Sequence, residues 1–165
     1  MIAIRDDRLA VPEGDGSMGT KNQELADYFI DAAEGKRSGA VAGSDRRIKK
    51  RVPYNALVAI VLVGPTGQRG QPIVLRAKDL SLGGLCVLSR TMMYPGSRGA
   101  VQLVRSTGDV ALVGVEVRHC RYSGDMQHQV GLQFVPMAAE LSSDSFLDKT
   151  GRMALLDPSL KADAA

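Results

Sequence analysis

The chain has 165 residues, of which 44% are hydrophobic and 24% charged, and its formal net charge is +3. These values are typical of a globular protein and predict one compact domain with tails. Aromatic residues make up only 4% and tryptophan is absent, so we expect an aliphatic core and exclude base stacking on aromatic platforms as the main mode of recognition. No apolar run approaches the roughly 18 residues of a membrane span or the length of a signal peptide, which predicts a cytoplasmic protein without membrane insertion.

Few residues in this chain suit redox, metal or catalytic chemistry. Cys86 and Cys120 are the only cysteines, which is too few for a disulfide framework and predicts two buried, reduced thiols. Together with His119 and His128 they lack the spacing of metal ligands. Because no Ser/His/Asp or paired-carboxylate arrangement stands out either, the sequence predicts neither an enzyme nor a cofactor.

Residues 1–44 are predicted to form a flexible N-terminal tail with a helix near 21–34 and a linker. Apolar residues recur there at the spacing of one helix face: Leu25, Tyr28, Phe29, Ala32 and Ala33. Thr20 and Gln23 have the spacing of a capping box, and Gly35 is a stop signal. The small and polar residues that follow are typical of a linker.

From Val52 onward the chain reads as β structure. Runs rich in β-branched residues, separated by turn signals, predict strands near 55–63, 72–77, 85–88, 100–104, 110–121 and 128–135. Six short strands with close turns favour a small antiparallel barrel, which we assign to residues 45–136. Residues 137–165 are assigned to a C-terminal helix and tail, because several apolar residues there could cap the barrel: Leu141, Phe146, Leu147, Leu155 and Leu156. Gly151 weakens that helix.

The residues best suited to ligand chemistry form two groups. Five of the six residues from Arg46 to Arg51 are basic, and a flexible run rich in arginine suits phosphates and guanine faces. Further along, Asp79 and Ser81 are expected to end a strand beside a short turn, where they offer a carboxylate and a hydroxyl. Gly84 would let the backbone approach closely or turn sharply. A hairpin between the two groups would bring them together.

Read in order, Arg-x-x-x-Arg (Arg47, Arg51) and Asp-x-Ser-x-x-Gly (Asp79, Ser81, Gly84) resemble the PilZ family of bacterial cyclic di-GMP receptors. The segments 115–118 and 130–134 are similar to the last two barrel strands of that family, so the resemblance covers about 45–136. It implies a mainly β fold, with a six-stranded antiparallel PilZ-type barrel, a flanking C-terminal helix and an N-terminal helix outside the barrel.

The resemblance also implies roles for individual residues. Arg47 and Arg51 would hold phosphate and guanine, Asp79 and Ser81 would bind guanine, and Gly84 would shape the turn. Family members with an arginine at the position of Arg46 tend to bind two stacked, intercalated ligand molecules, so we expect two nucleotides per chain. The expected function is that of a receptor that changes conformation on binding cyclic di-GMP and so regulates an unidentified partner protein.

The sequence also allows four other interpretations. A PilZ-like adaptor that binds proteins but no nucleotide is the main alternative. The basic run could instead be a solvated linker or bind nucleic acid, which we do not expect to be its role. Residues 14–19 match Gly-x-Gly-x-x-Gly but lack the preceding strand and βαβ unit of a dinucleotide site, and we read them as tail. The sequence leaves the oligomeric state open.

Overall fold

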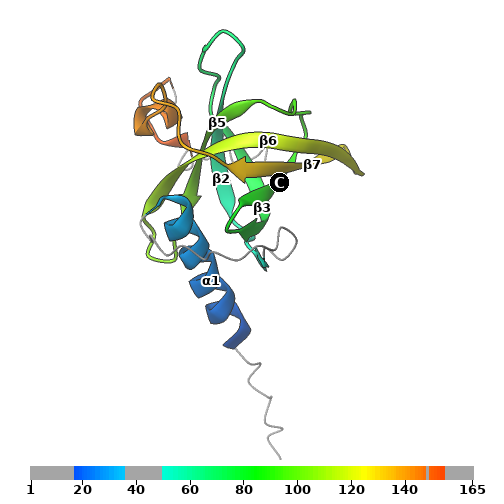
Figure 1. Ribbon diagram of the computed structural model, residues 1–165, viewed down its shortest axis with the longest axis vertical. Coiled ribbons are helices and arrows are strands. Elements are labelled where there is room, and N and C mark those ends of the chain that lie inside the picture. Colours follow the sequence, from blue (N-terminus) through cyan, green and yellow to red (C-terminus); the bar gives the residue numbers. More distant parts are fainter. Residues whose placement is uncertain (1–16, 36–49, 148, 155–165) are drawn as a thin grey trace, which may run out of the picture.

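The computed structural model of the protein describes residues 17–35, 50–147 and 149–154. Its elements are α1 (Ser17–Ala33), β1 (Arg51–Pro53), β2 (Leu57–Val63), β3 (Ile73–Ser81), β4 (Gly84–Ser89), β5 (Arg98–Val104), β6 (Val110–Gly124), β7 (Gln127–Phe134) and the 3-10 helix η1 (Ser143–Phe146). Six strands follow one another in the order β3-β2-β5-β6-β7-β4, all antiparallel, and the pairing of β4 with β3 closes the barrel (Figure 1). The predicted six-stranded antiparallel barrel is therefore confirmed.

Strand β1 lies outside this ring and was not predicted, because three residues containing an arginine and a proline carry no strand signal. β1 pairs with residues 79–81 of β3, while β2 pairs with residues 73–76 along the same edge. Between them, the N–H of Tyr54 donates to the carbonyl oxygen of Lys78 at 3.1 Å. The second half of β3 is thus held between β1 on one edge and β4 on the other.

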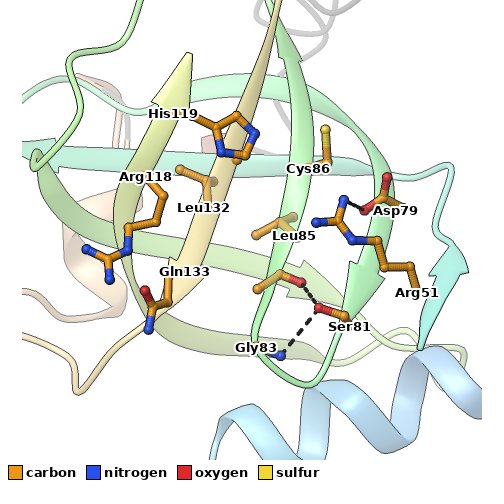
Figure 2. A pocket seen from close by; sticks show the side chains of 12 residues that line it. Arg51, Asp79, Ser81, Gly83, Leu85, Cys86, Arg118, His119, Leu132 and Gln133 are labelled. Atoms are coloured by element: carbon orange, nitrogen blue, oxygen red, sulfur yellow. Dashed lines mark hydrogen bonds and ion pairs between the residues drawn. The ribbon is translucent and has the colours of Figure 1, made fainter. Parts of the chain in front are cut away.

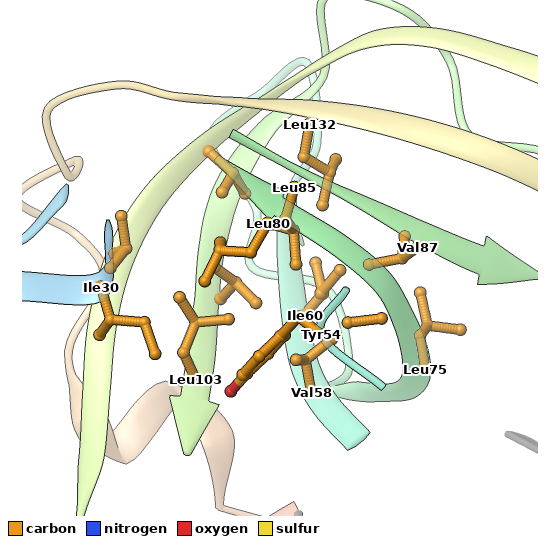
Figure 3. Close-up of a cluster of buried hydrophobic side chains, with 14 of the residues drawn as sticks. Ile30, Tyr54, Val58, Ile60, Leu75, Leu80, Leu85, Val87, Leu103 and Leu132 are labelled. Atoms are coloured by element: carbon orange, nitrogen blue, oxygen red, sulfur yellow. The ribbon is translucent and has the colours of Figure 1, made fainter. Parts of the chain in front are cut away.

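The barrel interior is filled by aliphatic side chains, as the composition predicted (Figure 3). Among the buried residues are Val58, Ile60, Leu80, Leu85, Val87, Leu103 and Leu132. Tyr54 is one of the aromatic residues of this core, and its hydroxyl donates to the carbonyl oxygen of Val104 at 2.6 Å. Burial raises the pKa of Tyr54 to about 12, because the phenolate would lose its hydration.

Helix α1 lies outside the sheet but belongs to the same core. Its apolar face contributes Ala26, Phe29 and Ile30, each 4% exposed or less, to the cluster that fills the barrel. The helix begins at Ser17, earlier than predicted. It stops where the sequence indicated, since Gly35 has φ +73° and its N–H closes the last turn on the carbonyl oxygen of Ala32.

A cluster of charges also attaches α1 to the turn between β5 and β6. Arg105 is 11% exposed and forms ion pairs with Asp31 at 3.0 Å, with Glu34, and with Asp109 at 2.9 Å. Burial by itself would lower the pKa of Arg105, but hydrogen bonds to Glu34 and Asp109 outweigh it and the pKa is raised. The side chain of Asp27 accepts hydrogen bonds from Ser106 in the same turn.

The C-terminal segment covers the outer face of β2, β3 and β5 without forming the expected α-helix in its described part. Leu141, Phe146 and Ala154 pack there on a small cluster of Ala59, Val61, Val74 and Ala100. In the described part of this segment the named helical element is η1, where the N–H of Ser142 donates to the hydroxyl of Ser145 as in a capping box. The backbone is already extended at Leu147, so this 3-10 helix ends there, and the described residues do not show the expected C-terminal α-helix. Leu155 and Leu156 lie outside the described residues.

Candidate functional site

A pocket of about 300 Å³ lies on the outer face of the barrel, over β3, β4, β7 and β6 (Figure 2). Its lining combines charged, polar and very small residues: Arg51, Asp79, Ser81, Gly83, Gly84, Leu85, Cys86, Arg118, His119, Gly131, Leu132 and Gln133. Arg51, Asp79, Ser81 and Gly84 were all predicted site residues. Arg46 and Arg47 lie outside the described residues.

Strand register explains why these residues meet. The row that points into the barrel is Val52, Leu80, Leu85, Leu132 and Val117, all buried. Successive residues of a strand point to opposite faces, so the two neighbouring rows point outward. One outward row is Asp79, Cys86, Gly131 and His119; the other is Arg51, Ser81, Gly84, Gln133 and Glu116. The pocket forms where both outward rows have small residues in their middle.

The pocket floor therefore consists of Ser81, Gly84, Cys86 and Gly131. A Cβ atom at Gly84 would lie 1.9 Å from the carbonyl oxygen of Leu132, so only glycine permits this approach of β4 and β7. At Gly131 a Cβ atom would lie 2.1 Å from Cε1 of His119, so the imidazole occupies the space that a side chain would need. Because neither glycine has a side chain, the floor lies lower than the charged residues on either side of it.

Arg51 and Asp79 form the first wall, which we call the Arg51 wall. Nη1 of Arg51 lies 3.3 Å from Oδ1 of Asp79, with 63% and 22% of the two side chains exposed. Arg51 was expected on a linker, but it lies in β1 directly opposite Ser81. Burial raises the pKa of the Cys86 thiol in the floor, and the Asp79 carboxylate raises it further. The pocket therefore holds a neutral thiol beneath an anion and a cation.

Asp79 and Ser81 lie at the end of β3, as expected for residues that close a strand before a hairpin turn. The two-residue turn is Leu82-Gly83, between the paired residues Ser81 and Gly84. The Ser81 hydroxyl donates to the carbonyl oxygen of Gly84 at 3.1 Å and accepts from the N–H of Gly83 at 3.4 Å. In this arrangement the hydroxyl proton stabilises the hairpin, and an oxygen lone pair is what Ser81 has left for a ligand.

Sequence reasoning missed the opposite wall, which consists of Arg118, His119 and Gln133 and which we call the Arg118 wall (Figure 2). Arg118 is 58% exposed, and its Nη1 donates to Oε1 of Glu116 at 2.9 Å. The one available signal was the break in alternation at Arg118-His119, where two polar residues follow one another in an otherwise alternating strand.

The described part of the chain contains neither a group of metal ligands nor a membrane-spanning helix. No group of three or more His, Cys, Asp or Glu residues is placed there to hold a metal ion. None of the helices described is long and apolar enough to cross a membrane.

Comparison with known protein families identifies the domain that carries this pocket. The sequence model of the PilZ domain matches residues 45–145, more than half of the chain. The protein belongs to the PilZ domain family. The match includes all six predicted site residues and both walls of the pocket, and it extends past the predicted end of the barrel domain into η1.

Solved PilZ structures resemble this chain at low sequence identity. The PilZ domain with c-di-GMP of YcgR from Escherichia coli is 16% identical, with a TM-score of 0.42, over 58% of this chain and 82% of that one. The Bacillus subtilis inhibitor of motility MotI/DgrA has the same identity and TM-score over 58% of this chain and 45% of its own. A tetrameric PilZ protein from Xanthomonas campestris is 23% identical, with a TM-score of 0.32, over 44% of this chain and 39% of that one. The match thus spans less than half of the latter two proteins. No curated protein matches the chain.

Proposed function

We propose that this protein is a receptor for cyclic di-GMP that changes conformation on binding and so regulates a partner protein. The observation that carries the proposal is the Arg51 wall: a cation and a carboxylate stand side by side above a floor without large side chains. This is the pair of groups that a guanine nucleotide requires. A guanidinium can bind phosphate or the O6/N7 edge of guanine bidentately, and a carboxylate can accept the N–H groups of the other guanine edge.

The ion pair itself is suited to exchange. An exposed pair such as Arg51 and Asp79 contributes at most about 1 kcal/mol to stability, because water screens both charges. A ligand that offers phosphate to Arg51 and N–H groups to Asp79 replaces one weak contact by several charge-assisted hydrogen bonds. The arrangement is therefore a preformed, lightly held site.

The pocket also limits how the ligand binds. Its volume of about 300 Å³ is at the low end for ligand pockets, and a molecule with two guanines, two riboses and two phosphates extends beyond it. Arg46 and Arg47, five and four residues before Arg51, are proposed to supply the remaining contacts. We propose that two intercalated nucleotides bind per chain, with the Arg46 guanidinium stacked on a guanine of the second.

Calorimetric titration of the full chain with cyclic di-GMP tests the site. Removing one charge-assisted contact, by Arg51→Ala or Asp79→Ala, should cost about 1.5–3 kcal/mol, which is roughly a ten- to hundredfold loss of affinity. Arg69→Ala removes an exposed arginine outside the pocket and should bind as the wild type does. A stoichiometry near two that falls to one in Arg46→Ala would support intercalation.

The alternative is a PilZ protein that binds a partner without nucleotide. It predicts no binding heat at any temperature and no thermal shift with the dinucleotide. Wild-type affinity in both Arg51→Ala and Asp79→Ala would also reject the proposed site, even if nucleotide bound elsewhere.

A further inference from the structure

We propose that Arg118 binds the ligand from the wall opposite Arg51, so that the nucleotide is held between two arginines on different strands. This inference rests on the proposed function and adds a contact that the two sequence motifs do not contain.

A β-bulge brings Arg118 and His119 to the same outer face of β6. Val117 lies opposite Leu132 and His119 lies opposite Gly131, so Arg118 is an additional residue in β6 without a partner in β7. The regular alternation would turn residue 119 into the barrel; the bulge instead leaves Arg118 and His119 both exposed above Gly131. Bulges of this kind commonly redirect side chains at functional sites.

The other wall contains a matching distortion. The pairing of β3 with β4 shifts between Ala77 and Asp79, which leaves Lys78 without a partner in β4 just before the carboxylate of the Arg51 wall. β3 is therefore irregular at the residue before Asp79, and β6 is irregular at Arg118 itself. The β4–β7 pairing of the floor between them has no such shift.

Neighbouring charges hold Arg118 in place without neutralising it. Glu116 is 14% exposed and accepts from Arg118 at 2.9 Å and from Arg98 at 3.1 Å, through different carboxylate oxygens. One negative charge is thus shared by two guanidinium groups, and the trio keeps a net positive charge. The contact from Arg118 to Glu116 uses one of five N–H donors of its guanidinium, which leaves a fork of donors for an anion or a guanine edge.

A solvated surface side chain without a ligand role is the competing interpretation of Arg118, and Arg121 serves as the comparison. Arg121 is on the same strand and also exposed, but it does not line the pocket. Arg118 differs from it in lining the pocket on the side opposite Arg51 and Asp79, with a floor of glycine, serine and cysteine between them. A ligand seated on that floor lies between positive groups on both sides, which suits a molecule with two negative charges.

Calorimetry with cyclic di-GMP on the full chain, comparing wild type, Arg118→Ala, Arg121→Ala and Arg51→Ala, tests the inference. We expect Arg118→Ala to bind roughly ten- to hundredfold more weakly, and Arg121→Ala to stay within twofold of wild type. Arg118→Lys keeps the charge and loses the planar fork, so its affinity should fall between those of wild type and Arg118→Ala. In ¹⁵N NMR spectra, the Arg118 Nε–H resonance should shift on adding nucleotide while that of Arg121 does not.

The outcomes separate this inference from the function on which it rests. Affinities of Arg118→Ala and Arg121→Ala that agree, beside a weak Arg51→Ala, would overturn the role of Arg118 and leave the receptor intact. A wild-type protein that binds no nucleotide would overturn both. If Arg118→Ala does not fold, wild-type affinity in Arg118→Lys together with an unmoved Arg118 resonance would overturn the role of Arg118.

Discussion

Replacing Gly84 by alanine should destabilise the fold before it affects any ligand. The new Cβ atom would lie 1.9 Å from the carbonyl oxygen of Leu132, whereas ordinary contacts begin at 3.4 Å, so the two strands must separate locally by about 1.5 Å. The obstacle is backbone, which cannot rotate away as a side chain can. Overpacking of this kind costs about 1–3 kcal/mol and a strained ladder hydrogen bond about 1 kcal/mol more, for a total of about 2–4 kcal/mol.

Urea unfolding followed by far-UV circular dichroism measures this loss in a chain without tryptophan. With a denaturant slope of about 1.5 kcal/mol/M, a loss of about 3 kcal/mol lowers the midpoint by about 2 M. Gly64→Ala is the matched control, because its Cβ atom would meet only the carbonyl oxygen of Gln68 at an ordinary 3.5 Å and its φ is not positive. Equal midpoints for the two variants would refute the steric argument for Gly84.

Three further predictions concern residues other than the charged side chains that are proposed to bind the ligand. The pKa of Tyr54 is raised from 10.0 to about 12, so Tyr54 should be the last tyrosine to ionise in a spectrophotometric titration. The free energy of unfolding should therefore fall by about 2–3 kcal/mol as the pH rises from 10 through 12. It should show no such loss from this group below pH 10. Arg105→Ala leaves three carboxylates without their shared cation and should lower the free energy of unfolding by about 3 kcal/mol. The exposed Arg121→Ala should lower it by less than about 0.5 kcal/mol. Equal losses would contradict the role of the Arg105 ion pairs in attaching α1. Buried Cys86 should react with iodoacetamide more slowly than the partly exposed Cys120, as mass spectrometry of digested protein can show, and faster labelling of Cys86 would contradict its burial.

The barrel was predictable because its strands carry their own signals. Alternation in segments such as 110–121 and turn residues between the runs report burial and chain reversal directly. β1 was missed because its pairing with β3 is a tertiary contact that three residues cannot encode. The expected C-terminal helix relied on apolar spacing alone; in its described part the apolar residues pack on β2, β3 and β5 around the short η1, which ends at the extended Leu147.

The same distinction applies to the candidate site. Arg51, Asp79, Ser81 and Gly84 were found because they form short motifs, and the structure brings all four to one pocket. The Arg118 wall could not be found in this way, because it faces them only through the register of β6, β7, β4 and β3. Of the two reasons that the sequence left open for Gly84, a close backbone approach and a sharp turn, the close approach of β7 is the one that requires glycine, while the turn itself lies at 82–83.

The shortness of β1 has a mechanical consequence. Arg51 points out to the pocket, and the next residue, Val52, points into the core on the side where α1 packs against β1. One peptide unit therefore connects the ligand-facing surface to the helix-facing surface, with no flexible element between them. A ligand that shifts the backbone at Arg51 must also shift Val52, so a spectroscopic label on α1 would report the occupancy of a pocket that the helix does not touch.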